Sequence, residues 1–176
     1  MITIYHGTDR ISAQRICSKD IDVSINHHRR LDFGPGFYTT DDIERAKMWA
    51  LRKANTRGEK PAIVTLSFDI DGADKDNFIT RFTDDLNWGQ FVINNRNGRA
   101  YISKMSNQLN NLDSMFDITY GRVADVDVTD VADMLKRSEL PLEDVNLILN
   151  PSYPMQYVFH TQNSISYIKK KSWRPA

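Results

Sequence analysis

Short runs in which apolar and polar residues alternate recur along the chain, and this pattern is typical of strands with one buried face. Such runs predict strands at residues 2–5, 37–40, 62–68, 78–82, 116–121 and 156–161. Apolar residues three and four positions apart predict helices at residues 11–16, 41–56, 84–97, 126–135, 142–149 and 164–170. The acidic residues 69–76 are expected to form a loop. Short strands with helices between them predict a mixed α+β fold.

Around Tyr38, the sequence DFGPGFYTTD is expected to form a glycine turn, a short strand and the start of a helix. Gly34 and Gly36 permit a tight turn and a close approach of a ligand to the backbone. Asp41 and Glu44 have the spacing of a capping box, which predicts where the following helix begins. Tyr38 is then either an ordinary packing residue or a flat aromatic side chain presented to a ligand.

The composition favours one soluble domain over residues 1–176. The 23 basic residues balance 23 acidic ones, so net charge gives no argument for binding to nucleic acid or to a membrane surface. The single cysteine, Cys17, excludes an internal disulfide and fits a reducing compartment. No apolar run approaches the roughly 20 residues that cross a bilayer, and the N-terminus lacks the pattern of a secretory signal. These features predict a cytoplasmic protein.

Two further places in the sequence are candidates for ligand contacts. His6 follows the first predicted strand and precedes Gly7, so its imidazole lies beside exposed backbone groups; the alternative is an ordinary surface histidine in a turn. Arg29 or Arg30 is expected either to contact an anion such as a diphosphate or to belong to a solvated loop. The neighbouring histidine pair lacks the spacing of a metal site, and no metal is expected.

Three segments at predicted strand positions carry a family resemblance. They are YHGT at residues 5–8, GPGFYT at residues 34–39 and QYVFHT at residues 156–161. Together they resemble the ADP-ribosyltransferase superfamily, in the histidine–tyrosine–glutamate branch that holds diphtheria toxin and the poly-ADP-ribose polymerases. The chain is also similar to a family of small bacterial proteins assigned to that superfamily. The resemblance implies a split antiparallel sheet around a cleft that binds NAD+ as substrate, without a metal.

The resemblance also implies roles for individual residues. His6 would hydrogen-bond the adenosine-ribose hydroxyls, and the backbone of Gly7 would bind the nicotinamide carboxamide. Tyr38 would lie against the nicotinamide ring, and Gln156 stands at the third catalytic position. The other residues implied to contact NAD+ are Thr8, Gly36, Phe37, Trp49, Arg30 and His160.

Gln156 departs from the superfamily pattern, which has glutamate at this position. An amide oxygen still accepts a hydrogen bond from a ribose hydroxyl, but it cannot stabilise positive charge as a carboxylate does. Polymer extension is therefore not expected, and Gln156→Glu is expected to keep or raise NAD+ cleavage. His160 is either a helper on the same strand face or a packed strand histidine. Trp49 forms either a second aromatic wall or part of an amphipathic helix core.

The resemblance favours a mono-ADP-ribosyltransferase that transfers ADP-ribose to an unidentified protein or nucleic acid and releases nicotinamide. By analogy, the protein would be a bacterial toxin, either an effector or one half of a toxin–antitoxin pair with a small neutralising partner. The alternatives are an NAD+ glycohydrolase, which uses water as acceptor, and a non-catalytic module that binds NAD+ or ADP-ribose. A purely structural domain would require all three segments to be coincidental packing.

Overall fold

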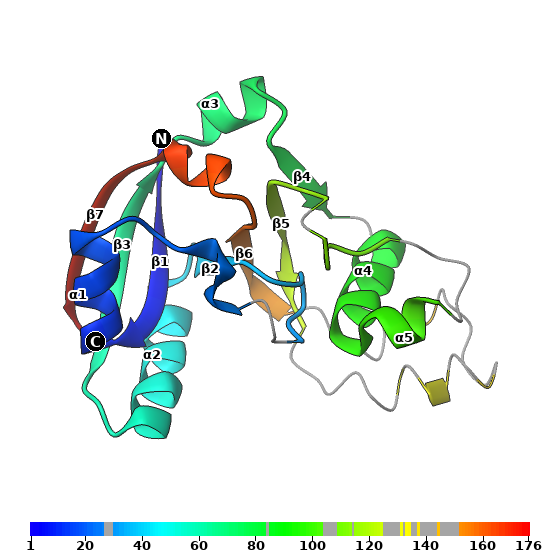
Figure 1. The fold of residues 1–176 in the computed structure, drawn as a ribbon, viewed down its shortest axis with the longest axis horizontal. Helices are drawn as coiled ribbons and strands as arrows, with labels where there is room; N and C mark the ends of the chain where they lie inside the picture. Colours follow the sequence, from blue (N-terminus) through cyan, green and yellow to red (C-terminus); the bar gives the residue numbers. More distant parts are fainter. Residues whose placement is uncertain are drawn as a thin grey trace.

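The computed structural model describes residues 1–26, 30–83, 85–103, 109–113, 115–124, 131, 133–134, 137, 144 and 152–176. Its centre is a seven-stranded sheet in the order β4-β5-β6-β2-β1-β3-β7 (Figure 1). The strands are β1 (Ile2–Asp9), β2 (Phe37–Thr40), β3 (Pro61–Phe68), β4 (Ile79–Phe82), β5 (Ile118–Val123), β6 (Ser152–Phe159) and β7 (Ile168–Pro175). The helices are α1 (Arg10–Ser18), α2 (Ile43–Arg57), α3 (Ile70–Lys75), α4 (Asp85–Asn97) and α5 (Arg99–Ile102), with 3₁₀ turns η1 (Val23–Asn26) and η3 (Asn163–Tyr167). The α+β class is confirmed.

Most neighbouring strands in the sheet are antiparallel, as expected, but β4 and β5 run parallel. A parallel pair requires a long crossover connection. Here that connection includes α4 and α5, so the antiparallel sheet implied by the resemblance is wrong at this edge.

The pairing of β1 leaves an opening in the middle of the sheet. β1 pairs with β3 along its whole length, from Ile2 to Asp9, but with β2 only at Tyr5 and Thr40. The first strand predicted from the sequence ends at residue 5, whereas β1 continues to Asp9. His6 and the residues after it therefore lie in a strand that has β3 on one side and is separating from β2 on the other.

The strand register places three of the expected site residues on one face of the sheet. Residues directly opposite on neighbouring strands share a face, and Tyr5 pairs with Thr40, which in turn pairs with Gln156. Gly7 lies two residues after Tyr5, and Tyr38 lies two residues before Thr40. Because side chains alternate along a strand, Gly7 and Tyr38 share the face of Gln156.

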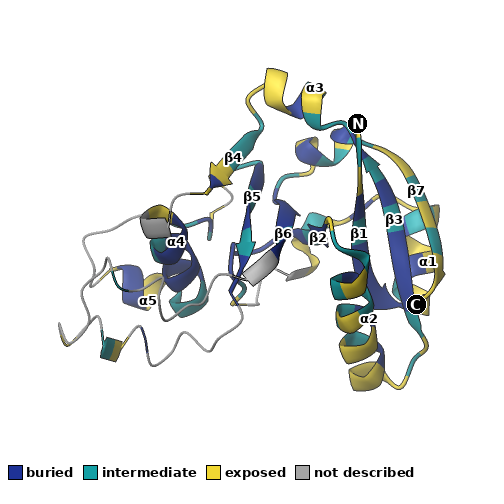
Figure 2. Ribbon diagram, turned by 180° about the vertical axis from the view of Figure 1, so that it is seen from behind, coloured by how far each residue is buried: buried dark blue, intermediate teal, exposed yellow. Residues whose placement is uncertain are grey.

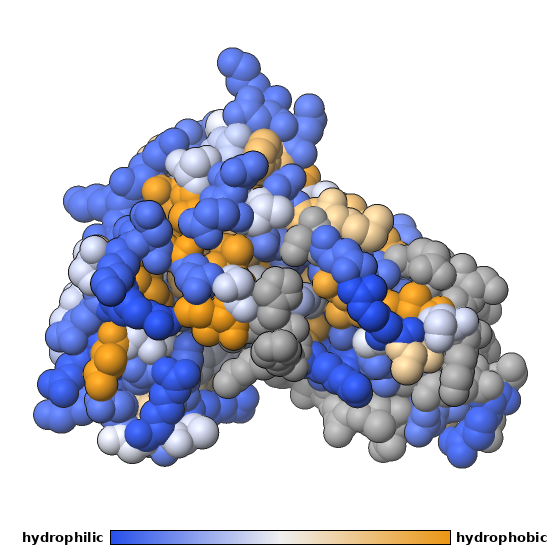
Figure 3. All heavy atoms as spheres, viewed as in Figure 1, coloured by the Kyte–Doolittle hydropathy of each residue, from blue (hydrophilic) through white to orange (hydrophobic). Residues whose placement is uncertain are grey.

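Helices cover both faces of the sheet. α1 packs on one face, where its buried Ala13 and Ile16 join the larger hydrophobic cluster. α2 lies on the other face, which carries Gly7 and Gln156, and α4 covers the same face farther along (Figure 2). Seen from this side, α2 and α4 flank β2 and β6. Figure 3 shows the opposite face, where hydrophilic surface surrounds apolar patches.

A row of alanines lets α2 approach β1 closely. Ala46, Ala50 and Ala54 recur every four residues and are fully buried. A Cβ added to Gly7 would lie 1.9 Å from the Ala46 carbonyl oxygen, so glycine is required by this close approach. The same face of the sheet could not accept this helix if the facing positions carried large side chains.

The start of α2 differs from the capping box expected at Asp41 and Glu44. The N-cap residue is Asp42, whose Oδ1 accepts hydrogen bonds from the backbone N–H groups of Glu44 (2.7 Å) and Arg45 (3.3 Å). The helix ends as expected, because Gly58 adopts the left-handed conformation with φ of 66°.

Two other predicted elements are wrong. The segment 69–76 contains α3 (Ile70–Lys75) rather than a loop, because the Asp69 side chain caps the helix by accepting from the Gly72 N–H. The predicted helix at 164–170 is instead η3 followed by β7, which pairs with β3. The lysines at 169–171 therefore lie on an edge strand, where charged side chains discourage aggregation.

The helices predicted at 126–135 and 142–149 lie largely outside the described residues. In the described part of the chain, no helix is long and apolar enough to cross a membrane.

Candidate functional site

A cavity of about 500 Å³ lies on the face of the sheet that α2 and α4 flank. Its lining combines residues from all three segments that carry the family resemblance: His6 and Gly7 from β1, Tyr38 from β2 and Gln156 from β6. Trp49 from α2 also lines it. These residues are brought together only by the sheet order, in which β6, β2 and β1 are successive neighbours.

His6 bridges the opening between β1 and β2. Its Nδ1 lies 2.6 Å from the Tyr38 carbonyl oxygen. Because a carbonyl oxygen only accepts, Nδ1 carries the proton and Nε2 is left as an acceptor. The ring stacks on Phe37 at 4.4 Å between centroids. Burial, with a smaller contribution from the Lys53 charge, lowers the pKa of His6 to about 3, so the imidazole is neutral at physiological pH.

We expect His6 to remain neutral throughout the range of about pH 5 to 8, where histidine ordinarily titrates. Its folded pKa lies below the ordinary 6.5, so the stability that depends on neutral His6 is complete above 6.5 and is lost as the pH falls toward about 3. Nearby Asp9 opposes this shift and Lys53 adds to it. An NMR titration of the imidazole resonances checks this prediction, with His6→Asn to assign them. An inflection of the His6 signal near pH 6.5 would contradict the buried, neutral state.

The ring and the hydroxyl of Tyr38 make different contacts. The ring lines the cavity, while the hydroxyl donates to the Gly34 carbonyl (2.7 Å) and accepts from the Phe33 N–H (3.0 Å). Gly34 has φ of 80°, a left-handed conformation that suits glycine. Burial, reinforced by the nearby Asp32 charge, raises the pKa of Tyr38 well above its usual range. The hydroxyl therefore stays protonated and fixes the glycine turn behind the ring.

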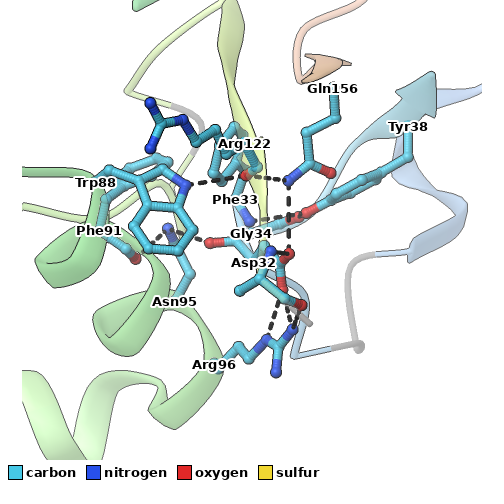
Figure 4. Close-up of polar contacts among 11 residues, drawn as sticks. Asp32, Phe33, Gly34, Tyr38, Trp88, Phe91, Asn95, Arg96, Arg122 and Gln156 are labelled. Atoms are coloured by element: carbon cyan, nitrogen blue, oxygen red, sulfur yellow. Dashed lines mark hydrogen bonds and ion pairs between the residues drawn. The ribbon is translucent and has the colours of Figure 1, made fainter. Parts of the chain in front are cut away.

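The glycine turn is also attached to α4 (Figure 4). The Asp32 carboxylate pairs with Arg96, whose Nε donates to Oδ1 at 2.5 Å. Asn95 of the same helix donates through Nδ2 to the backbone carbonyls of Asp32 (3.4 Å) and Phe91 (2.8 Å). The Phe33 side chain is fully buried in the cluster that includes Phe91. The turn that carries Tyr38 is thus held from both sides.

Gln156 is buried in the cavity wall and is only 1% exposed. Its Nε2 donates to the Arg122 carbonyl oxygen at 3.2 Å and lies 3.5 Å from Asp32 Oδ2. In Figure 4 the amide oxygen lies on the side of Tyr38. The amide can therefore offer an acceptor to a ligand beside the Tyr38 ring.

Trp49 and basic residues from α2 and α4 line the cavity. Trp49 is half-buried and lines the cavity, so it is not a fully buried core tryptophan. The basic lining residues are Arg45, Arg52, Lys53, Arg57 and Arg96, against one acidic residue, Asp32. In a chain with no net charge, this is a local concentration of positive charge.

A smaller cavity of about 150 Å³ is also lined by His6. Its lining includes Gly36 and Phe37, two of the residues implied by the resemblance. His6, Lys53 and Arg57 contribute to both cavities. The two hollows therefore adjoin at the same side chains.

Three expected contact residues, Thr8, Arg30 and His160, are not among those lining either cavity. Thr8 is fully buried, and its Oγ1 has no hydrogen-bond partner among the described residues. Arg30 is exposed and lies near Gly98, while Arg29 lies outside the described residues.

His160 is held in the interior through both of its ring nitrogens. Nδ1 donates to the Pro35 carbonyl (2.5 Å), which leaves Nε2 to accept from the Thr119 hydroxyl (2.8 Å). Burial lowers the pKa of His160 to about 4. These contacts support the interpretation of a packed strand histidine.

Sequence reasoning missed the Asp32–Arg96 pair and the basic residues of α2. Arg45, Trp49, Arg52 and Thr56 follow helical spacing, so this face of α2 was detectable from periodicity. Asp32 and Arg96 are far apart in the sequence and belong to a loop and a helix, so no local signal connects them.

Among the described residues, no three His, Cys, Asp or Glu side chains are grouped to hold a metal ion.

Comparison with known proteins gives a family but no named relative. No curated protein and no solved structure matches the chain. A family described as a protein of unknown function (DUF3990) matches residues 2–170 and so includes all three site segments. This match covers nearly the whole chain, which therefore belongs to the DUF3990 family.

Proposed function

We propose that this protein is an NAD+-dependent mono-ADP-ribosyltransferase with the cavity as its active site. The observation that carries the proposal is that His6, Tyr38 and Gln156 line one cavity, although they lie in three separate segments. These are the positions that resemble the histidine–tyrosine–glutamate signature. A resemblance produced by chance would not require the three positions to meet.

In the proposed reaction, the bond between the ribose carbon and the nicotinamide nitrogen breaks. Nicotinamide leaves with the bonding electron pair, which neutralises its positive ring. A nucleophile on the acceptor forms the new bond to the ribose carbon and loses a proton to solvent. This chemistry mainly needs a ligand that is held, oriented and partly shielded from water. It does not require a covalent bond to the protein.

The cavity residues suit these tasks. The Tyr38 ring and Trp49 offer aromatic surfaces for the nicotinamide ring. The neutral His6 offers Nε2 as an acceptor, and Gln156 offers its amide oxygen, so both can accept from ribose hydroxyls. Gln156 itself carries no charge where the superfamily has glutamate, which makes mono-transfer the expected outcome rather than polymer extension.

The basic lining suits the diphosphate that joins the two halves of NAD+. Arg57 pairs with Asp9 at 2.8 Å, yet it still lines both cavities together with Lys53. Guanidinium and ammonium groups are the usual protein partners of phosphate oxygens. We therefore place the diphosphate beside His6, with the adenosine half toward the smaller cavity and the nicotinamide half in the larger one. In this placement, basic residues of α2 contact the diphosphate, a contact that the sequence suggested for Arg29 or Arg30.

A second function, a binding module without catalysis, is favoured by one specific observation. The residue at the expected glutamate position is an amide whose nitrogen is engaged by its neighbours. Such a site can bind NAD+ or ADP-ribose without stabilising the charge that develops on the ribose. The toxin role, the acceptor and a neutralising partner stay predictions.

The purified protein is expected to release nicotinamide from NAD+ and to label a macromolecule when cell lysate is added. NAD+ labelled in its adenylate phosphate follows the transfer, and chromatography follows the nicotinamide. Release that needs lysate and labels a macromolecule would support a transferase. Release without lysate or label would support the glycohydrolase instead. Saturable NAD+ binding without any release would support the binding module. The absence of both binding and release would contradict the proposed site.

A further inference from the structure

The strongest unassigned feature is the buried carboxylate beside Gln156. Asp32 is 8% exposed and lines the cavity. Its Oδ1 pairs with Arg96, and its Oδ2 accepts from the Ala124 N–H at 3.0 Å. Gln156 Nε2 lies 3.5 Å from the same Oδ2. A buried carboxylate held by this many donors has a fixed position.

The surroundings of Gln156 allow only one orientation of its amide. Nε2 faces Asp32 Oδ2 and the Arg122 carbonyl oxygen. A carboxylate paired with arginine and a carbonyl oxygen are acceptors only, so the amide must turn its N–H₂ group toward them. A flipped amide would place its oxygen against two other oxygens. The Arg122 carbonyl is itself fixed, because the Trp88 indole N–H donates to it at 2.9 Å.

We infer that Asp32 is a positioning residue that fixes the Gln156 amide, with Nε2 toward the wall and Oε1 toward the cavity. Figure 4 shows this oxygen on the side of Tyr38, where it can accept a hydrogen bond from a hydroxyl group of the ligand. That ligand role rests on the proposed function, in which the donor is a ribose hydroxyl. The orientation itself rests only on the contacts of Asp32 and Arg122.

The inference explains why an amide occupies position 156. A glutamate there would place a second carboxylate against Asp32 and would have no N–H for the Arg122 carbonyl. Like charges in a buried site are unfavourable, as is an acceptor left without a donor. The expectation from the sequence, that Gln156→Glu keeps or raises NAD+ cleavage, is therefore reversed. In the wild-type protein, Asp32 carries the negative charge of the cavity wall beside position 156.

The test compares Gln156→Glu, Asp32→Asn and the double variant, which exchanges the amide and the carboxylate. Gln162→Glu is the matched control, because its Nε2 also donates to a backbone carbonyl, that of Ile21, but on an exposed residue. Urea unfolding without NAD+ measures how far each variant destabilises the contacts that orient the amide. Nicotinamide release by the folded proteins measures the effect of that orientation on turnover.

We expect Gln156→Glu to lose stability and to lower turnover about tenfold, while Gln162→Glu changes neither. The double variant should be more stable and more active than Gln156→Glu, a rescue that a merely structural role of Asp32 does not predict. Gln156→Glu with wild-type stability would overturn the inference. If Gln156→Glu fails to fold, a folded double variant supports the inference and an unfolded one overturns it. If the wild type neither binds nor cleaves NAD+, the proposed function fails, and the unfolding data alone decide the orientation.

Discussion

Replacing Tyr38 with alanine is expected to lower nicotinamide release about a hundredfold, whereas Tyr38→Phe should retain most of it. The two variants separate the ring from the hydroxyl. The ring lines the cavity, and the hydroxyl bonds to Phe33 and Gly34 in the turn behind it. Tyr38→Phe should instead lose about 1 kcal/mol of unfolding free energy, because two backbone groups lose a partner.

The comparison needs a measurement of folding beside the rate. Tyr38→Ala also removes buried surface, so its rate must be measured at a temperature where urea unfolding shows that the variant is folded. Tyr38→Phe is the matched control for the loss of the turn contacts. Equal rates in Tyr38→Ala and the wild type would show that the ring does not contact the substrate. A large loss of rate in Tyr38→Phe would show that turnover requires the hydroxyl rather than the ring.

Gly7→Ala is expected to lower the free energy of unfolding by about 3 kcal/mol. The added Cβ would lie 1.9 Å from the Ala46 carbonyl oxygen and 2.8 Å from the Ala50 nitrogen. Both atoms belong to the backbone of α2 and cannot move without displacing the helix. Because α2 carries Trp49 and most of the basic lining, any NAD+ binding should weaken together with stability.

Gly58→Ala provides the control for a general effect of removing glycine. Gly58 ends α2 with φ of 66°, and nothing lies within 4 Å of a Cβ added there. The free energy of unfolding of this variant should therefore fall by only about 1 kcal/mol, the cost of placing an alanine in the left-handed conformation. Urea unfolding of both variants gives the comparison. Equal and small losses would mean that α2 does not lie against β1 at Gly7.

The site residues on strands were the predictable part of the molecule. The sequence places Tyr38 and Gln156 in predicted strands and His6 directly after one, and the resemblance implies that they meet. The structure brings them to one cavity because β1, β2 and β6 are neighbours. The strand order itself depends on pairing between distant residues, which no local pattern determines.

Pairing between distant residues also explains where the sequence misled. The lysine-rich C-terminal segment has polar residues that suit a helix end, yet β3 offers an unpaired edge, and the segment forms β7 along it. Tertiary pairing outweighs local preference in such cases. The Asp32–Arg96 pair was undetectable for a related reason, since it joins the glycine turn to α4 only after the chain has folded.

The most direct test of the central claim is a calorimetric titration of NAD+ into the wild-type protein, with Tyr38→Ala beside it. The account predicts one saturable site with a dissociation constant below about 1 mM, competition by ADP-ribose, and loss of the signal in Tyr38→Ala. Absence of saturable binding by the folded wild-type protein would contradict an NAD+ site in this cavity. Equal binding by both proteins would place the NAD+ site elsewhere.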